Sequence, residues 1–178
     1  MSEKIFSIVT VTMQFDPLED RLIMDCSDKS KNTQRLWLTR RLLDRLIPSL
    51  TDQLEVNSTN KISKELEQSF EQEKAEINKT KTESVKLIKN NPSWLVTSVK
   101  VGKNSQEFKL LFIEDKIENE NYQNKAEFVL AIPNLRQWLN ALFKIYLKAN
   151  WDTKFFPGWI DTDTVSYTHL TLPTIREV

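Results

Sequence analysis

Arginine is the residue of this sequence best suited to binding an anion, and it is concentrated in one stretch. Arg35, Arg40, Arg41 and Arg45 lie close together, whereas most other cations are lysines. The planar guanidinium matches phosphate and carboxylate groups in a two-pronged geometry. We therefore predict a binding site for an anion or a nucleic acid at these four arginines. The alternative is ion pairing within the protein, to Asp16, Glu19, Asp20 or Asp44.

A second candidate site is a group of aromatic residues late in the chain. Trp151, Phe155, Phe156 and Trp159 fall in an apolar segment. Large aromatic side chains often anchor protein interfaces, and they also stack on nucleic-acid bases. We predict that these four residues bind a partner. The alternative is that the segment folds back over the domain and completes its core.

The end of the sequence stands apart from the rest. The segment from Val165 to Thr174 resembles the translated adapter of transposase-based sequencing libraries, read in one frame. We therefore interpret residues 165–178 as an artefact and leave them out of fold prediction. On this interpretation His169, the one histidine, is not a natural residue. We also expect the natural sequence beyond Thr164 to be missing. A natural tail that matches by accident is the alternative.

Residues for the commonest catalytic sites are scarce. If residues 165–178 are an artefact, the natural part of the sequence contains no histidine, which is the most frequent acid–base group and metal ligand. The two glycines, Gly102 and Gly158, are too few for a glycine-rich phosphate-binding loop. Cys26 falls on the apolar face of a predicted strand, which indicates a core residue rather than a nucleophile. We therefore expect no enzyme, no cofactor and no metal site.

The bulk composition is that of a globular protein. Of 178 residues, 39% are hydrophobic and 28% are charged, with 25 basic and 25 acidic residues. The zero net charge provides no general attraction to nucleic acid or to anionic membranes. The sequence has no signal-peptide pattern, no membrane-spanning run and a single cysteine. These features predict a cytoplasmic protein that does not contact a membrane.

The elements that would position these residues begin with a unit over residues 1–55. Apolar and polar residues alternate from Val9 to Phe15, which predicts a half-buried strand. Two more strands are predicted at Arg21–Cys26 and Arg35–Leu38. A helix follows directly, with Thr39 as its N-terminal cap. Pro48 inside this helix is expected to kink or break it.

Residues 56–91 are rich in lysine, glutamate, asparagine, serine and threonine. Ile62, Leu66, Phe70 and Ile77 recur at nearly helical spacing, but they form only a thin apolar stripe. We predict an exposed helical connector, with a disordered linker as the alternative.

Residues 92–164 repeat the first pattern and end in the aromatic segment. Strands are predicted at Trp94–Val101, Glu107–Ile113 and Ala126–Ile132. A helix then runs from Pro133 to about Asn150, because proline is favoured in a first helical turn.

The predicted fold is therefore α+β, with two pseudo-repeated β-β-β-α units joined by a charged connector. The third strand of each unit is apolar on both faces, so we expect both faces to be covered. Such duplicated units resemble, in architecture alone, those of the Whirly and PUR single-strand nucleic-acid-binding proteins. Units of those families are described with four strands, whereas three are predicted here.

The function predicted from these observations is a non-enzymatic protein-interaction or scaffolding module, a subunit of a larger intracellular complex. The alternative is a single-stranded nucleic-acid-binding protein that uses the arginine cluster and exposed aromatic residues. The expected partner is another protein, and nucleic acid or a second copy of the chain are further candidates. Arginines and exposed aromatics on one sheet face would favour nucleic acid. An apolar patch without flanking cations would favour a protein.

Overall fold

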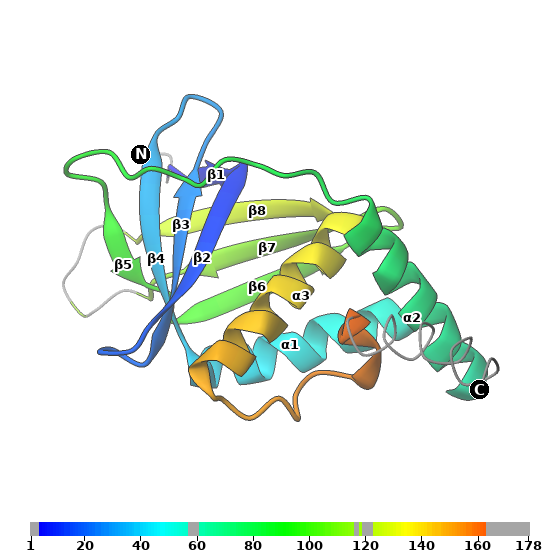
Figure 1. Cartoon of the computed structure of the whole chain (residues 1–178). Helices are drawn as coiled ribbons and strands as arrows, with labels where there is room; N and C mark the ends of the chain where they lie inside the picture. The colour runs from blue at the N-terminus through cyan, green and yellow to red at the C-terminus, as the bar shows by residue number, and fades with distance from the viewer. Residues whose placement is uncertain (1–3, 57–60, 116–117, 119–122, 163–178) are drawn as a thin grey trace.

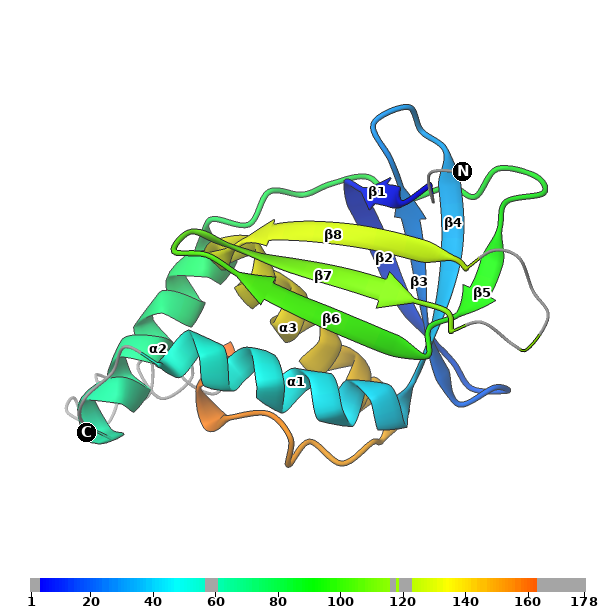
Figure 2. The same ribbon diagram turned by 180° about the vertical axis from the view of Figure 1, so that it is seen from behind.

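The computed structural model of the chain describes residues 4–56, 61–115, 118 and 123–162. Residues 165–178, which we interpret as an artefact, lie outside the described residues. The structure consists of two four-stranded sheets and three long helices (Figure 1). The strands of one sheet run steeply across those of the other, and α1 runs beside β6 (Figure 2).

The first sheet has the order β2-β3-β4-β5, in which β2, β3 and β4 are antiparallel neighbours and β5 is parallel to β4. Its strands are β2 (Thr10–Asp16), β3 (Arg21–Ser27), β4 (Thr33–Thr39) and β5 (Ser93–Leu95).

The second sheet has the order β1-β8-β7-β6, with β6, β7 and β8 antiparallel and β1 parallel to β8. Its strands are β1 (Phe6–Ile8), β6 (Ser98–Lys103), β7 (Glu107–Ile113) and β8 (Lys125–Ala131).

The two halves of the chain exchange their first strands. The first half contributes β1 to the second sheet, and the second half contributes β5 to the first sheet. Hydrogen bonds hold the chain where it passes from one sheet to the other. The Val9 amide donates to the Ser27 carbonyl over 2.8 Å, and the Val96 amide donates to the Trp37 carbonyl over 2.9 Å. Each half therefore completes the sheet of the other, and we expect the two to fold together.

The predicted α+β fold with two repeated sheet-and-helix units is confirmed, and the exchanged strands add a fourth strand to each unit. Both additional strands are only three residues long. The prediction of one strand over Trp94–Val101 is wrong, because the chain passes from β5 in one sheet to β6 in the other. The structure thus has the order β-β-β-β-α in each half.

The helices are α1 (Arg40–Glu55), α2 (Lys61–Ile77), α3 (Ile132–Ala149) and the short 3-10 helix η1 (Gly158–Ile160). Of these, α1 and α3 begin within one residue of the predicted starts, whereas no start was predicted for α2 or η1. Thr39 caps α1, since its hydroxyl accepts a hydrogen bond of 3.2 Å from the Leu42 amide. Pro48 does not break α1, whose apolar side remains buried on both sides of it. The connector is helical in α2, and residues 79–92 then cross to β5 without regular structure.

A single core lies between the two sheets, α1 and α3. It contains apolar residues of both halves, such as Leu22 and Leu36 of the first sheet and Phe108 and Leu110 of the second, all fully buried. Burying such a side chain stabilises the fold by roughly 1.5–3 kcal/mol. The expectation that both faces of the third strands are covered is wrong at Val129, which is 44% exposed on the outer face of β8.

None of the helices within the described residues is both long enough and apolar enough to cross a lipid bilayer.

Candidate functional site

The structure divides the predicted arginine site between a sheet and a helix. Arg35 lies on the outer face of β4, opposite Asp25 of β3 in the strand register. Its Nε and Nη2 atoms donate to the two carboxylate oxygens of Asp25 over 2.8 and 3.0 Å. This hydrogen bonding raises the pKa of Arg35. Because Asp25 is only 6% exposed, the Arg35 guanidinium neutralises a buried carboxylate of the protein itself.

The other three arginines, Arg40, Arg41 and Arg45, lie on the exposed surface of α1. In the part of the chain that the structure describes, none of them forms an ion pair within 4.0 Å. Asp44, one of the expected partners, instead accepts a 2.7 Å hydrogen bond from the hydroxyl of Tyr146 on α3. These three cations remain free to contact an anion, but they do not share the sheet face that holds Arg35.

The aromatic segment is mostly buried. Trp151, Phe156 and Trp159 are exposed by 8% or less, and only Phe155 is half-buried. The ring of Tyr146 packs edge-on against Trp151 and Phe156, at centroid distances of 5.0 and 4.9 Å. These contacts complete the core below α3, as in the alternative that the sequence left open. In this conformation the three buried side chains cannot contact a partner.

The indole nitrogens of this segment connect it to the first half of the chain. Nε1 of Trp151 donates to Asp20 over 2.8 Å, in the turn between β2 and β3. Nε1 of Trp159 donates to Glu55 at the end of α1 over 2.7 Å. Burial opposes ionisation of Glu55, but hydrogen bonds from Lys64 and Trp159 hold its pKa below the usual value. The segment therefore stabilises the arrangement of α1, α2 and α3.

Helix α2 packs on the domain through polar side chains. Gln72 donates to the carbonyl of Arg136 over 2.8 Å, and Gln137 donates to the carbonyl of Ala75 over 2.9 Å. Arg136 donates from Nη2 to Gln68, and its guanidinium lies 5.2 Å from the centre of the Trp159 ring. Burial lowers the pKa of Arg136. The inner face of α2 is thus hydrogen-bonded rather than apolar.

The apolar stripe of α2 faces solvent instead. Ile62, Leu66, Phe70 and Ile77 are exposed by 75%, 69%, 66% and 75%. A helix normally turns its apolar stripe toward the core, so this arrangement is inverted. We call these four residues the α2 stripe. Periodicity in the sequence revealed the stripe, but which face of α2 would be buried depended on its contacts with α3.

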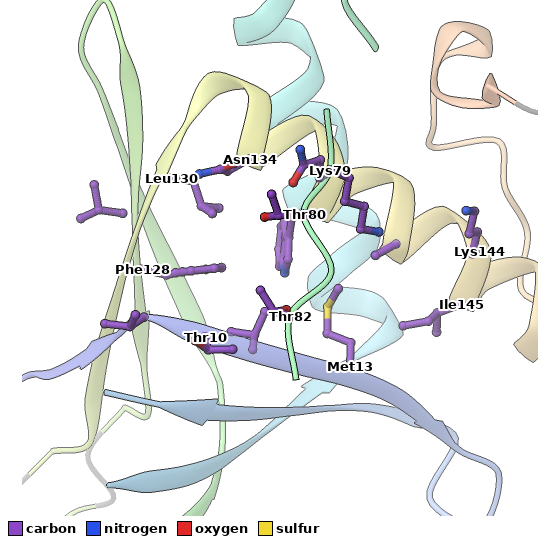
Figure 3. Close-up of a pocket in the computed structure, with 16 residues that line it drawn as sticks. Thr10, Met13, Lys79, Thr80, Thr82, Phe128, Leu130, Asn134, Lys144 and Ile145 are labelled. Carbon is purple, nitrogen blue, oxygen red and sulfur yellow. The ribbon is translucent and has the colours of Figure 1, made fainter. Parts of the chain in front are cut away.

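A cleft of about 510 Å³ lies between β2, β8, α3 and the start of the 79–92 segment. Figure 3 shows side chains of these elements converging on it, among them Met13, Phe128, Leu130 and Ile145. Its charged residues are two lysines, Lys79 and Lys144. Sequence analysis did not predict this cleft, because its walls come from four separate parts of the chain.

The described residues contain no group of three or more histidine, cysteine, aspartate or glutamate side chains that could hold a metal ion. No protein-family model matches the chain, and neither a curated protein nor a solved structure matches it. The functional argument therefore depends on the surfaces described above.

Proposed function

We propose that this chain is a non-enzymatic protein-interaction module that binds a protein partner through the α2 stripe. The exposure of four large apolar side chains on one helix face is the observation that carries the proposal. Exposed apolar surface of this kind marks interaction sites on folded proteins. Covering each of these side chains would contribute about 1–2 kcal/mol, given that roughly two-thirds of each is open to solvent.

The charged residues beside the α2 stripe indicate the surface chemistry of a complementary partner. Glu65 and Glu73 lie beside it along the helix, whereas Lys74 is the neighbouring cation. Lys64 is paired with Glu55 over 2.8 Å and does not offset these carboxylates. A complementary partner therefore presents an apolar strip with basic margins, such as one face of an amphipathic helix.

The anchoring of α2 supports a binding role. Its hydrogen bonds to α3 through Gln68, Gln72 and Gln137 hold the helix in one orientation. A surface that is already ordered loses less conformational entropy on binding. The stripe is thus presented as a rigid surface, which favours a specific partner.

The test uses the full chain and the double variant Leu66→Gln with Phe70→Gln. Leu18→Gln is the matched control, because Leu18 is 95% exposed on the turn after β2, away from α2. A partner captured from nuclease-treated host lysate is identified, purified and titrated by calorimetry. We expect the double variant to bind at least about tenfold more weakly, corresponding to ~1.4 kcal/mol, and the control to bind as the wild type. Equal affinity of the correctly folded double variant would refute the proposal.

Single-strand nucleic-acid binding is the second candidate function. Two observations favour it: each half has four strands before its helix, as described for Whirly and PUR units, and Arg40, Arg41 and Arg45 are exposed without ion pairs among the described residues. Loss of every captured partner after nuclease treatment would support this function over the first.

A further inference from the structure

We infer that the cleft between β2, β8 and α3 binds a small amphiphilic carboxylate, that is, an anion with an aliphatic body. This site lies on a different surface from the α2 stripe and does not depend on the proposed protein interaction. Its volume of about 510 Å³ falls within the usual range for small-molecule sites, roughly 300–1,000 Å³.

Aliphatic side chains form a continuous part of the cleft walls, beside threonine, asparagine and glutamine side chains. Figure 3 shows Met13 of β2, Leu130 of β8 and Ile145 of α3 around it, and Val9 and Val11 also line it. Val9 is 52% exposed although it lies between two strands. A bound alkyl chain would cover this surface and gain about 25 cal/mol for each Å² of apolar area removed from water.

The charges at the cleft are of one sign. Lys79 and Lys144 line it, and no lining residue is acidic. Within the described residues neither lysine forms an ion pair. The local field is therefore positive even though the chain as a whole has equal numbers of basic and acidic residues. An anionic head group is the complement of this pair.

An indole in the cleft wall lacks an acceptor among the described residues. Trp138 lines the cleft, is 4% exposed, and its Nε1–H has no hydrogen-bond partner in the part of the chain that the structure describes. Its ring is held edge-on to Phe128 at a centroid distance of 6.5 Å. A buried donor without a partner costs roughly 1–3 kcal/mol. A carboxylate oxygen that reached this N–H would remove that cost.

The same rings argue against a nucleic-acid base as the occupant. Bases stack on open aromatic faces. Phe128 and Trp138 are only 5% and 4% exposed and pack against one another. The remaining apolar walls are aliphatic, which suits an alkyl chain better than a planar base.

The experiment titrates the full chain with decanoate below its micellar concentration, using calorimetry and tryptophan fluorescence. We expect saturable binding, with decanol, which lacks the charge, binding at least about tenfold more weakly. Lys144→Met should weaken decanoate at least about fivefold and leave decanol unchanged. Lys148→Met is the matched control, since Lys148 is exposed on α3 but does not line the cleft, and it should bind decanoate as the wild type does.

A second variant tests the position of the binding site without changing the charge of the cleft. Ala141→Phe places a ring in the cleft from α3 and should abolish decanoate binding while circular dichroism remains native. The Leu66→Gln and Phe70→Gln variant should bind decanoate normally, because those residues lie on another surface. Absent or unsaturable decanoate binding, equal affinity for decanol, or an unchanged Lys144→Met would overturn the inference. Displacement of decanoate by a short oligothymidylate would instead assign the cleft to nucleic acid.

Discussion

The buried thiol of Cys26 should make this protein unfold more readily at alkaline pH. Cys26 is fully buried on the core side of β3, where its thiol makes a weak hydrogen bond of 3.6 Å to the Met24 carbonyl. Burial raises the pKa of this thiol well above its ordinary value of 9.0, and the nearby charge of Asp25 raises it further. The thiol therefore stays protonated in the folded state at pH values where the unfolded chain ionises.

The sign and size of the effect follow from this difference. The unfolded state binds fewer protons than the folded state once the pH exceeds about 9, so stability falls as the pH rises. The contribution is fully present below that pH and is lost at about 1.4 kcal/mol per pH unit above it. Integrated from pH 8 to pH 10, the expected loss from this one group is about 1.4 kcal/mol.

Comparison with Cys26→Ala isolates this contribution, because the chain has a single cysteine. The substitution also leaves a small cavity, but that cost does not depend on pH. Free energies of unfolding would be measured by urea titration at pH 7, 8, 9 and 10 under reducing conditions. The advantage of the wild type over the variant should shrink by about 1.4 kcal/mol between pH 8 and pH 10. A constant difference would refute the reasoning that the native thiol resists ionisation.

Two further predictions concern the arginines. Arg35→Ala should lower the free energy of unfolding by about 2–3 kcal/mol, because it leaves the carboxylate of Asp25 buried without its partner. In a double-mutant cycle, replacing both residues by alanine should recover part of this loss. An Arg35→Ala variant as stable as the wild type would contradict the prediction. Arg40→Ala with Arg41→Ala should change stability by less than about 0.5 kcal/mol, since both side chains are exposed. If α1 contacts nucleic acid, the same double variant should bind a labelled single-stranded oligonucleotide more weakly, as measured by fluorescence anisotropy. A large loss of stability in this variant would contradict the description of Arg40 and Arg41 as free surface cations.

Local patterns in the sequence were sufficient for most of the regular structure. Alternation of apolar and polar residues predicted the strands that became β2 and β3, and the strand predicted at Glu107–Ile113 has the bounds of β7. Thr39 was recognised as a helix cap from its residue type and place, and its hydroxyl makes the expected bond. These features depend on neighbouring residues, whose spacing is visible in the sequence.

The candidate sites required contacts between distant parts of the chain. The Arg35–Asp25 pair depends on the register between β3 and β4, and the burial of Trp159 depends on α1 and α3. Sequence analysis therefore identified residues with the right chemistry but could not establish which of them had internal partners. For the aromatic segment it left two alternatives; in the structure Trp151 and Phe156 are buried against Tyr146, and Trp159 is buried against Arg136 of α3.

The sequence by itself determined the α+β class, the repeated units and the apolar periodicity of α2, because each is a regular pattern over a short stretch. The tertiary structure alone decided the exchange of β1 and β5, since strands of three residues carry too little periodicity to be recognised and pair with partners in the other half of the chain. It also decided that α2 turns its apolar stripe to solvent, because glutamines on the opposite face bond to α3. The cleft beside α3 likewise exists only where both sheets and the 79–92 segment meet.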